Sequence, residues 1–229
     1  MLAIARLDGQ IQYVANNTNM LVQRYTWAND RTLFFTSAED NALYLWKPFE
    51  PNLVPERVID LGPANATPDW SPRSLAVSAT GRHVAVVTPV GVELIEVATP
   101  GKPKRSLVPR TNSTVTTVAF SPGNRFLYFR SPDQPIRRVD LTHPQLPAAD
   151  VLTAGKVRGF ALSNDGRLLI TATERAFEWY DATRDPPVPL GSYTTAVSPS
   201  HWQLAPDGRH LLVVEHGVAY VLRLATRSP

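Results

Sequence analysis

The stretch Leu162-Ser163-Asn164-Asp165-Gly166-Arg167-Leu168-Leu169-Ile170 decides the fold of this chain. It reads as the end of one apolar strand, a tight turn containing Asp-Gly, and the start of a second apolar strand, which is a hairpin pattern. Residues 204–212 repeat it most closely, as Leu-Ala-Pro-Asp-Gly-Arg-His-Leu-Leu. Residues 120–128 and 77–85 are looser copies, and residues 27–34 are the loosest, with a turn one residue shorter.

An arginine follows the turn in every copy. The five positions are Arg31, Arg82, Arg125, Arg167 and Arg209, which gives spacings of 51, 43, 42 and 42 residues. A nearly constant period of this length indicates a repeat architecture.

The first four repeats each read as four short strands, at residues 157–162, 168–172, 177–181 and 190–194 in the fourth copy. The second strand is apolar at nearly every position in all five copies, which predicts a strand covered on both faces. No segment shows capped helical periodicity over about ten residues. The repeats span about residues 20–61, 74–108, 115–153, 157–194 and 201–226.

Composition limits the classes of function. The chain has 229 residues, no cysteine and a net charge of +3. Disulfides and thiolate sites are excluded, although the compartment is not fixed by this. Because the basic residues are scattered, nucleic-acid binding gains little support. We find no signal-peptide core and no apolar run of the roughly 18 residues that a membrane span needs, so we expect a cytoplasmic protein without membrane insertion.

The repeats resemble divergent WD-repeat blades. The resemblance is carried by the turns at residues 163–167 and 205–209, and by a large apolar residue followed by Asp in Val139-Asp140 and Tyr180-Asp181. No Trp-Asp pair is present, nor a Gly-His pair before the first strand. The resemblance implies an all-β fold, a β-propeller of four-stranded antiparallel blades, with five blades in one domain over residues 1–229.

The fifth repeat has strands at residues 201–204, 211–215 and 218–224 and then ends without a fourth strand. In proteins that the repeats resemble, an N-terminal strand often completes the last blade. Residues 1–7 and 10–15 flank an Asp8-Gly9 turn and read as a hairpin, and residues 10–15 are the candidate closing strand. Alternatively, the chain is the tail of a longer propeller and residues 1–7 end a truncated blade.

A feature shared by all repeats serves the blade, so we interpret the repeated arginine as structural and expect binding sites where the repeats differ. The resemblance places the loops between blades and the loops between second and third strands on one face, the top face. Trp70 and Arg73, in the proline-rich loop 62–73, form a plausible anchor there; Trp70 could instead fold back over its own blade. The partner-binding candidates are Trp70, Arg73, Arg110, Arg130, Arg158, Arg175 and Trp202, with core packing as the alternative for Trp202.

Enzyme chemistry has little support in the sequence. The predicted first strands contain no Asp or Glu, which paired-carboxylate catalysis along the channel would need. The five histidines lack metal-ligand spacing. We therefore expect no catalytic residue, metal or cofactor, and predict a protein-interaction platform that is a subunit or regulatory domain of a larger assembly. The alternative is an enzyme or small-ligand binder that uses the channel mouth, as lactonase-like or glycan-binding propellers do.

Overall fold

A computed structural model describes residues 3–5, 11–13, 22–27, 32–37, 40–47, 54–62, 72–89, 91–97, 105–109, 115–132, 134–152, 157–205 and 207–224. The chain forms two compact units, Met1–Asn112 and Ser113–Pro229.

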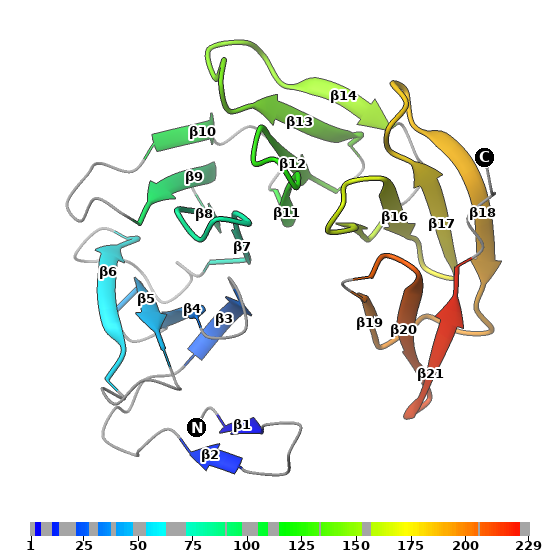
Figure 1. Ribbon diagram of the computed structural model, residues 1–229, viewed down its shortest axis with the longest axis horizontal. Helices are drawn as coiled ribbons and strands as arrows, with labels where there is room; N and C mark the ends of the chain where they lie inside the picture. Colours follow the sequence, from blue (N-terminus) through cyan, green and yellow to red (C-terminus); the bar gives the residue numbers. More distant parts are fainter. Residues whose placement is uncertain are drawn as a thin grey trace. The chain divides into compact units, whose positions relative to one another are not determined.

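Unit 1 holds a two-stranded sheet and two four-stranded sheets, all antiparallel (Figure 1). The small sheet pairs β1 (Ala3–Ala5) with β2 (Ile11–Tyr13), which confirms the predicted hairpin. The first large sheet has the order β3 (Val22–Trp27), β4 (Leu33–Ser37), β5 (Ala42–Trp46) and β6 (Glu56–Asp60). The second has the order β7 (Ser74–Val77), β8 (His83–Thr88), β9 (Gly91–Glu96) and β10 (Arg105–Pro109).

Unit 2 holds two four-stranded sheets and one three-stranded sheet (Figure 1). The first comprises β11 (Thr117–Phe120), β12 (Phe126–Arg130), β13 (Ile136–Asp140) and β14 (Ala149–Leu152). The second comprises β15 (Gly159–Leu162), β16 (Leu168–Ala172), β17 (Ala176–Asp181) and β18 (Val188–Thr194). The third comprises β19 (His201–Leu204), β20 (His210–Glu215) and β21 (Val218–Arg223).

The described residues contain strands and turns and no helix, so the all-β prediction is confirmed. Four four-stranded sheets and one three-stranded sheet are consistent with five blades. The three strands of the last sheet agree with the missing fourth strand in the sequence. Addition of residues 10–15 beside β21 stays a prediction, as does the single domain.

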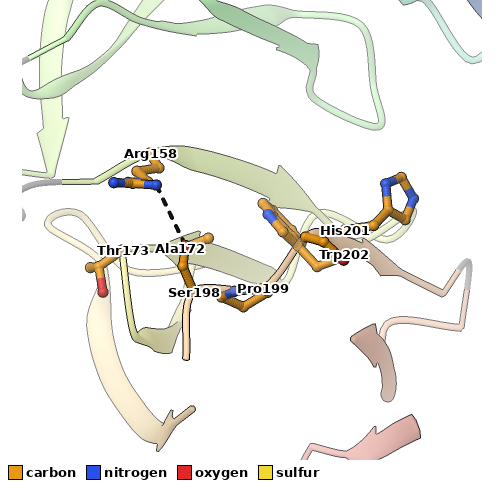
Figure 2. Close-up of a pocket in the computed structure, with 8 residues that line it drawn as sticks. Arg158, Ala172, Thr173, Ser198, Pro199, His201 and Trp202 are labelled. Carbon is orange, nitrogen blue, oxygen red and sulfur yellow. Dashed lines mark hydrogen bonds between the residues drawn. The ribbon is translucent and has the colours of Figure 1, made fainter. Parts of the chain in front are cut away.

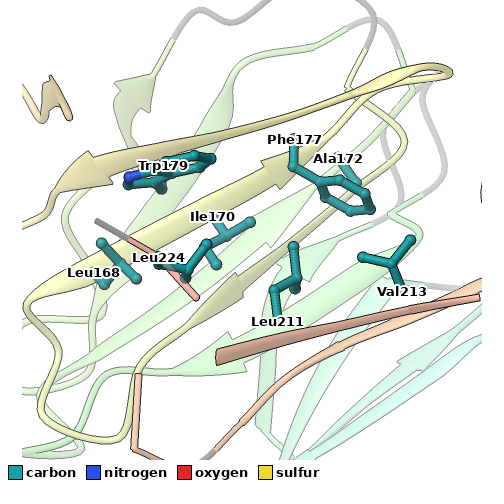
Figure 3. Close-up of a cluster of buried hydrophobic side chains, with 8 residues drawn as sticks. All are labelled: Leu168, Ile170, Ala172, Phe177, Trp179, Leu211, Val213 and Leu224. Carbon is teal, nitrogen blue, oxygen red and sulfur yellow. The ribbon is translucent and has the colours of Figure 1, made fainter. Parts of the chain in front are cut away.

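The second strands form the centre of the core. All five residues of β4 and of β16 are buried, as their largely apolar sequences predict. One cluster joins β16 and β17 to β20 through Ile170, Phe177 and Leu211, each fully buried (Figure 3). Burial of each such side chain stabilises the fold by about 1.5–3 kcal/mol. The last sheet of unit 2 is therefore held against its neighbour by a layer of buried apolar side chains.

The turn between the first and second strands has the same geometry in four repeats. The fourth residue of the turn, just before the repeated arginine, has positive φ at Gly81, Asn124, Gly166 and Gly208. Glycine and asparagine tolerate this left-handed conformation, which explains the choice of residue there. The N–H of Gly166 donates to the carbonyl of Ser163 at 2.9 Å, which closes the turn.

Polar side chains cap the same end of the sheets in unit 2. The Asp140 carboxylate accepts from the Thr142 N–H at 2.9 Å and from the Arg125 guanidinium at 2.9 Å. The Arg125 guanidinium also lies 4.8 Å from the centre of the Phe126 ring. This Arg125 geometry, with contacts to a neighbouring Asp and an apolar surface, is the one expected for a structural repeat arginine.

Candidate functional site

The candidate site lies at the opposite end of the sheets in unit 2, which we call the top edge. It comprises residues 157–158 before β15, 173–175 between β16 and β17, and 195–200 between β18 and β19. The pairing registers bring these connections together, because Gly159 faces Ala172 and Ala176 faces Thr194 across the sheet. These are the loops that the sequence predicts to carry function.

A pocket of about 240 Å³ opens at this edge, between the sheet β15–β18 and the sheet β19–β21 (Figure 2). Its polar wall is formed by Arg158, Thr173, Ser198 and Ser200, and its apolar wall by Trp202. His201 also lines it, but successive side chains of a strand alternate in direction, and Figure 2 shows the His201 ring turned away from Arg158.

The backbone of Arg158 is held on both sides. Its N–H donates to the carbonyl of Ala172 at 2.6 Å. Its carbonyl accepts from the guanidinium of Arg130 at 3.1 Å. Arg130 is only 6% exposed and also donates to the Thr116 hydroxyl at 3.3 Å, so it joins two neighbouring sheets and presents little surface to a partner.

The side chain of Arg158, in contrast, lies open to solvent. It is 61% exposed and donates to the carboxylate of Glu174, itself 67% exposed, at 3.2 Å. A second, long contact of 3.5 Å joins its guanidinium to the Ser198 hydroxyl. A guanidinium has five N–H donors, so these two contacts leave capacity for a further acceptor.

Trp202, which forms the apolar wall of the pocket, is held in place by its neighbours. Its ring meets the edge of Phe177 with centroids 5.6 Å apart and an interplanar angle of 68°. A Cβ atom at Gly159 would lie 3.1 Å from the Trp202 ring, so glycine allows the close approach of β15. Trp202 is half-buried, and one part of it packs in the core while another lines the pocket.

The structure places the seven predicted partner-binding residues in different settings. Arg158 and Trp202 line one pocket, Arg130 lies beneath it, and Arg175 is exposed on the neighbouring β16–β17 turn. Arg73 belongs to unit 1, where it is exposed and its carbonyl accepts from Arg24 at 2.9 Å. Trp70 and Arg110 lie outside the described residues.

Sequence reasoning missed Thr173, Ser198 and Ser200. Short hydroxyl residues in loops carry no spacing signal, and ordinary turns use them as often as binding sites do. The Ser-Pro-Ser run at residues 198–200, just before a first strand, is the only hint that the sequence offers.

No arrangement of three or more His, Cys, Asp or Glu side chains that could hold a metal ion occurs in the part of the chain that the structure describes. In the same part, no helix is long and apolar enough to cross a membrane.

Comparison with known proteins shows the fold. No family model matches the chain, and no curated protein matches it. Among the solved structures that match is the β-propeller domain of Cps50 (Swd1) from Myceliophteria thermophila, with a TM-score of 0.68 and 14% identity. The match covers 92% of this chain and 66% of that one, so the chain spans just under two thirds of that structure's length.

At this identity the likeness shows architecture alone. The chain has the fold of a β-propeller, and its architecture is that of a divergent WD-repeat-like propeller.

Proposed function

We propose that this chain is a non-catalytic protein-interaction platform, a subunit or regulatory domain of a larger assembly, and that the top edge of unit 2 contacts the partner. The observation that carries the proposal is the pocket, where an exposed arginine and a half-buried tryptophan meet at loops that differ between repeats. Arginine and tryptophan are enriched among the residues that dominate protein interfaces. Function is inferred here from the site, because many functions share this fold.

The first strands of unit 2 support the non-catalytic part of the proposal. The sequences of β11, β15 and β19 are Thr-Val-Ala-Phe, Gly-Phe-Ala-Leu and His-Trp-Gln-Leu, without a carboxylate. Hydrolysis by paired carboxylates needs two such groups close together. Trp70 and Arg73 as a second anchor, contact by Arg110, and the cytoplasmic location stay predictions.

A pull-down from the native host tests the platform. The intact chain is compared with the Arg158→Glu, Arg175→Glu double variant, which reverses two exposed charges at the top edge. The matched control is Arg184→Glu, Arg223→Glu, which makes the same change on two exposed residues at the other end of the sheets of unit 2.

We expect a protein that the intact chain and the control retain and the top-edge variant loses. Retention of no specific protein would contradict the platform. Equal retention by both variants would exclude the top edge of unit 2 as the contact face.

A further inference from the structure

The pocket at the top edge has room for an amino-acid side chain. Its volume of about 240 Å³ lies below the roughly 300–1,000 Å³ of sites that enclose a whole small molecule. It is also open to solvent along the loops. A side chain projecting from a partner fits this space better than a free metabolite does.

The positive charge at the pocket favours binding of an anion. None of the described residues that line it is acidic, and Arg158 places a guanidinium at its edge. The Ser198 hydroxyl beside that guanidinium can donate to an incoming oxygen while it accepts from Arg158. A carboxylate would therefore meet a charged donor and a hydroxyl donor together.

Glu174 already forms an ion pair with the Arg158 guanidinium, but this pair is weak. The two side chains are 61% and 67% exposed, and one guanidinium nitrogen makes the 3.2 Å contact. Exposed ion pairs of this kind contribute little to stability, so replacing Glu174 by another carboxylate costs little. The fixed backbone of Arg158 keeps the base of the side chain in place while its tip changes partner.

We propose that this pocket receives an aspartate or glutamate side chain of a partner polypeptide. The incoming carboxylate replaces Glu174 on the Arg158 guanidinium, and the aliphatic part of the incoming side chain lies against Trp202. Glu174 is then an internal competitor that keeps the pocket occupied when the partner is absent. This inference rests on the proposed function and names the chemistry of its contact.

A titration followed by NMR tests the exchange. The probe is N-acetyl-glutamate N-methylamide, added to the intact ¹⁵N-labelled chain while the Arg158 Nε–H and Trp202 indole N–H signals are recorded. We expect saturable shifts at millimolar concentration, no saturable shift in Arg158→Gln, and about two- to fivefold tighter binding in Glu174→Gln. Arg184→Gln, at the other end of the sheet, serves as the control and should bind as the unaltered chain does.

The affinity of the Glu174→Gln variant for the probe separates an anion site from a cation site. Loss of the Glu174 charge should strengthen binding of an anion, whereas it would weaken binding of a cation. The proposal is overturned if the matched N-acetyl-glutamine N-methylamide produces the same shifts, or if Arg158→Gln binds unchanged. Inorganic phosphate that saturates the signals at lower concentration would also overturn the choice of a carboxylate.

The two proposals fail separately. If the Arg158→Glu, Arg175→Glu variant loses a partner but the titration is negative, the platform proposal is supported and the carboxylate pocket is excluded. If the titration is positive but the chain retains no partner, the anion site is supported and the platform proposal is excluded.

Discussion

At the scale of single residues, the repeated turn depends on serine and aspartate more than on the arginine that marks the period. The hydroxyls of Ser78, Ser121 and Ser163 each accept the N–H of the residue five positions on, at 2.9, 3.0 and 2.9 Å. In the fifth repeat Ala205 replaces the serine, and the Asp207 carboxylate accepts the N–H of His210 at 3.2 Å. Two residue types thus satisfy the same backbone donor.

Ser163→Ala should destabilise unit 2. The Ser163 hydroxyl is buried, accepts from Leu168 N–H at 2.9 Å and donates to Asp165 at 2.6 Å. Its removal leaves a buried N–H without an acceptor, which costs about 1–3 kcal/mol. Urea denaturation measures the loss, and Asn164→Ala, at an exposed position of the same turn, is the control. Equal effects of the two changes would contradict the assignment.

Asp140 should make stability depend on pH in the acid range. The Thr142 hydroxyl, together with the Arg125 guanidinium, holds the pKa of Asp140 well below its ordinary value of 3.8. A lowered folded-state pKa gives stability that is present above the unfolded value and is lost as pH falls through the folded value. Asp140→Asn should therefore be less stable than the unaltered chain at pH 7.

The same comparison at low pH completes the test. The difference between Asp140→Asn and the unaltered chain should shrink as pH falls below about 3.8, because protonation removes the charge that the substitution removes. Thermal melts at several pH values measure it, with Asp150→Asn in β14 as an exposed control. A difference that is constant with pH would show that the Asp140 charge is unimportant.

At the scale of elements, strand β18 approaches β17 closely because of one glycine. Gly191 pairs with Trp179, and a Cβ atom at Gly191 would lie 2.6 Å from the Trp179 ring. Gly191→Ala should therefore push the ring out of the core cluster and cost about 1–3 kcal/mol.

Calorimetry of three variants measures this effect. Gly123→Ala is the matched control, because no atom lies within 4 Å of a Cβ placed there, and it should be nearly neutral. Adding Trp179→Phe to Gly191→Ala should recover part of the loss by making room for the methyl group. No recovery in the double variant would indicate that the cost lies in the backbone and not in the ring contact.

Much of the element scale could be predicted from the sequence. In the fourth repeat the predicted strands at residues 157–162, 168–172, 177–181 and 190–194 agree within two residues with β15 to β18. Turn residues and continuous apolar strands are local signals, so one sequence suffices to read them. The sequence predicts that the second strand of every repeat is covered on both faces, but in β20 only Leu211 and Val213 are buried.

The candidate site was predicted only in part. Arg158 and Trp202 were each expected to contribute to binding, but they are far apart in the sequence and no motif joins them. Their meeting depends on the packing of the sheet β15–β18 against the sheet β19–β21 through Phe177 and Leu211. Such packing is tertiary structure, which a local sequence pattern does not encode. The ion pair between Glu174 and Arg158 could not be predicted for the same reason.

At the scale of the whole molecule, neighbouring repeats in unit 2 contact each other through their turns as well as their cores. A Cβ atom at Gly166 would lie 2.8 Å from Pro122, and one at Gly208 would lie 2.8 Å from Ser163. Each turn therefore sits against the turn of the preceding repeat. Stability in such arrays is a sum of repeat and nearest-neighbour contributions, so the repeats at the ends are the weakest unless another strand supports them.

Deletion of residues 1–15 tests whether an N-terminal strand supports the last repeat. Among the described residues, β21 pairs on one edge with β20, whereas the outer strands of the other four large sheets are fourth strands. If residues 10–15 add beside β21, the deletion should lower the melting temperature by at least about 4 °C. It should also speed hydrogen exchange at the β21 amides that do not bond to β20.

The exchange pattern separates this closure from the alternative. If residues 1–7 instead end a truncated blade of a longer propeller, exchange should quicken within unit 1 while β21 is unchanged. Deletion of residues 226–229 is the control for shortening the chain. Unchanged melting and unchanged exchange at β21 after removal of residues 1–15 would exclude closure by that segment, because a paired strand cannot be removed without exposing the amides that it bonded.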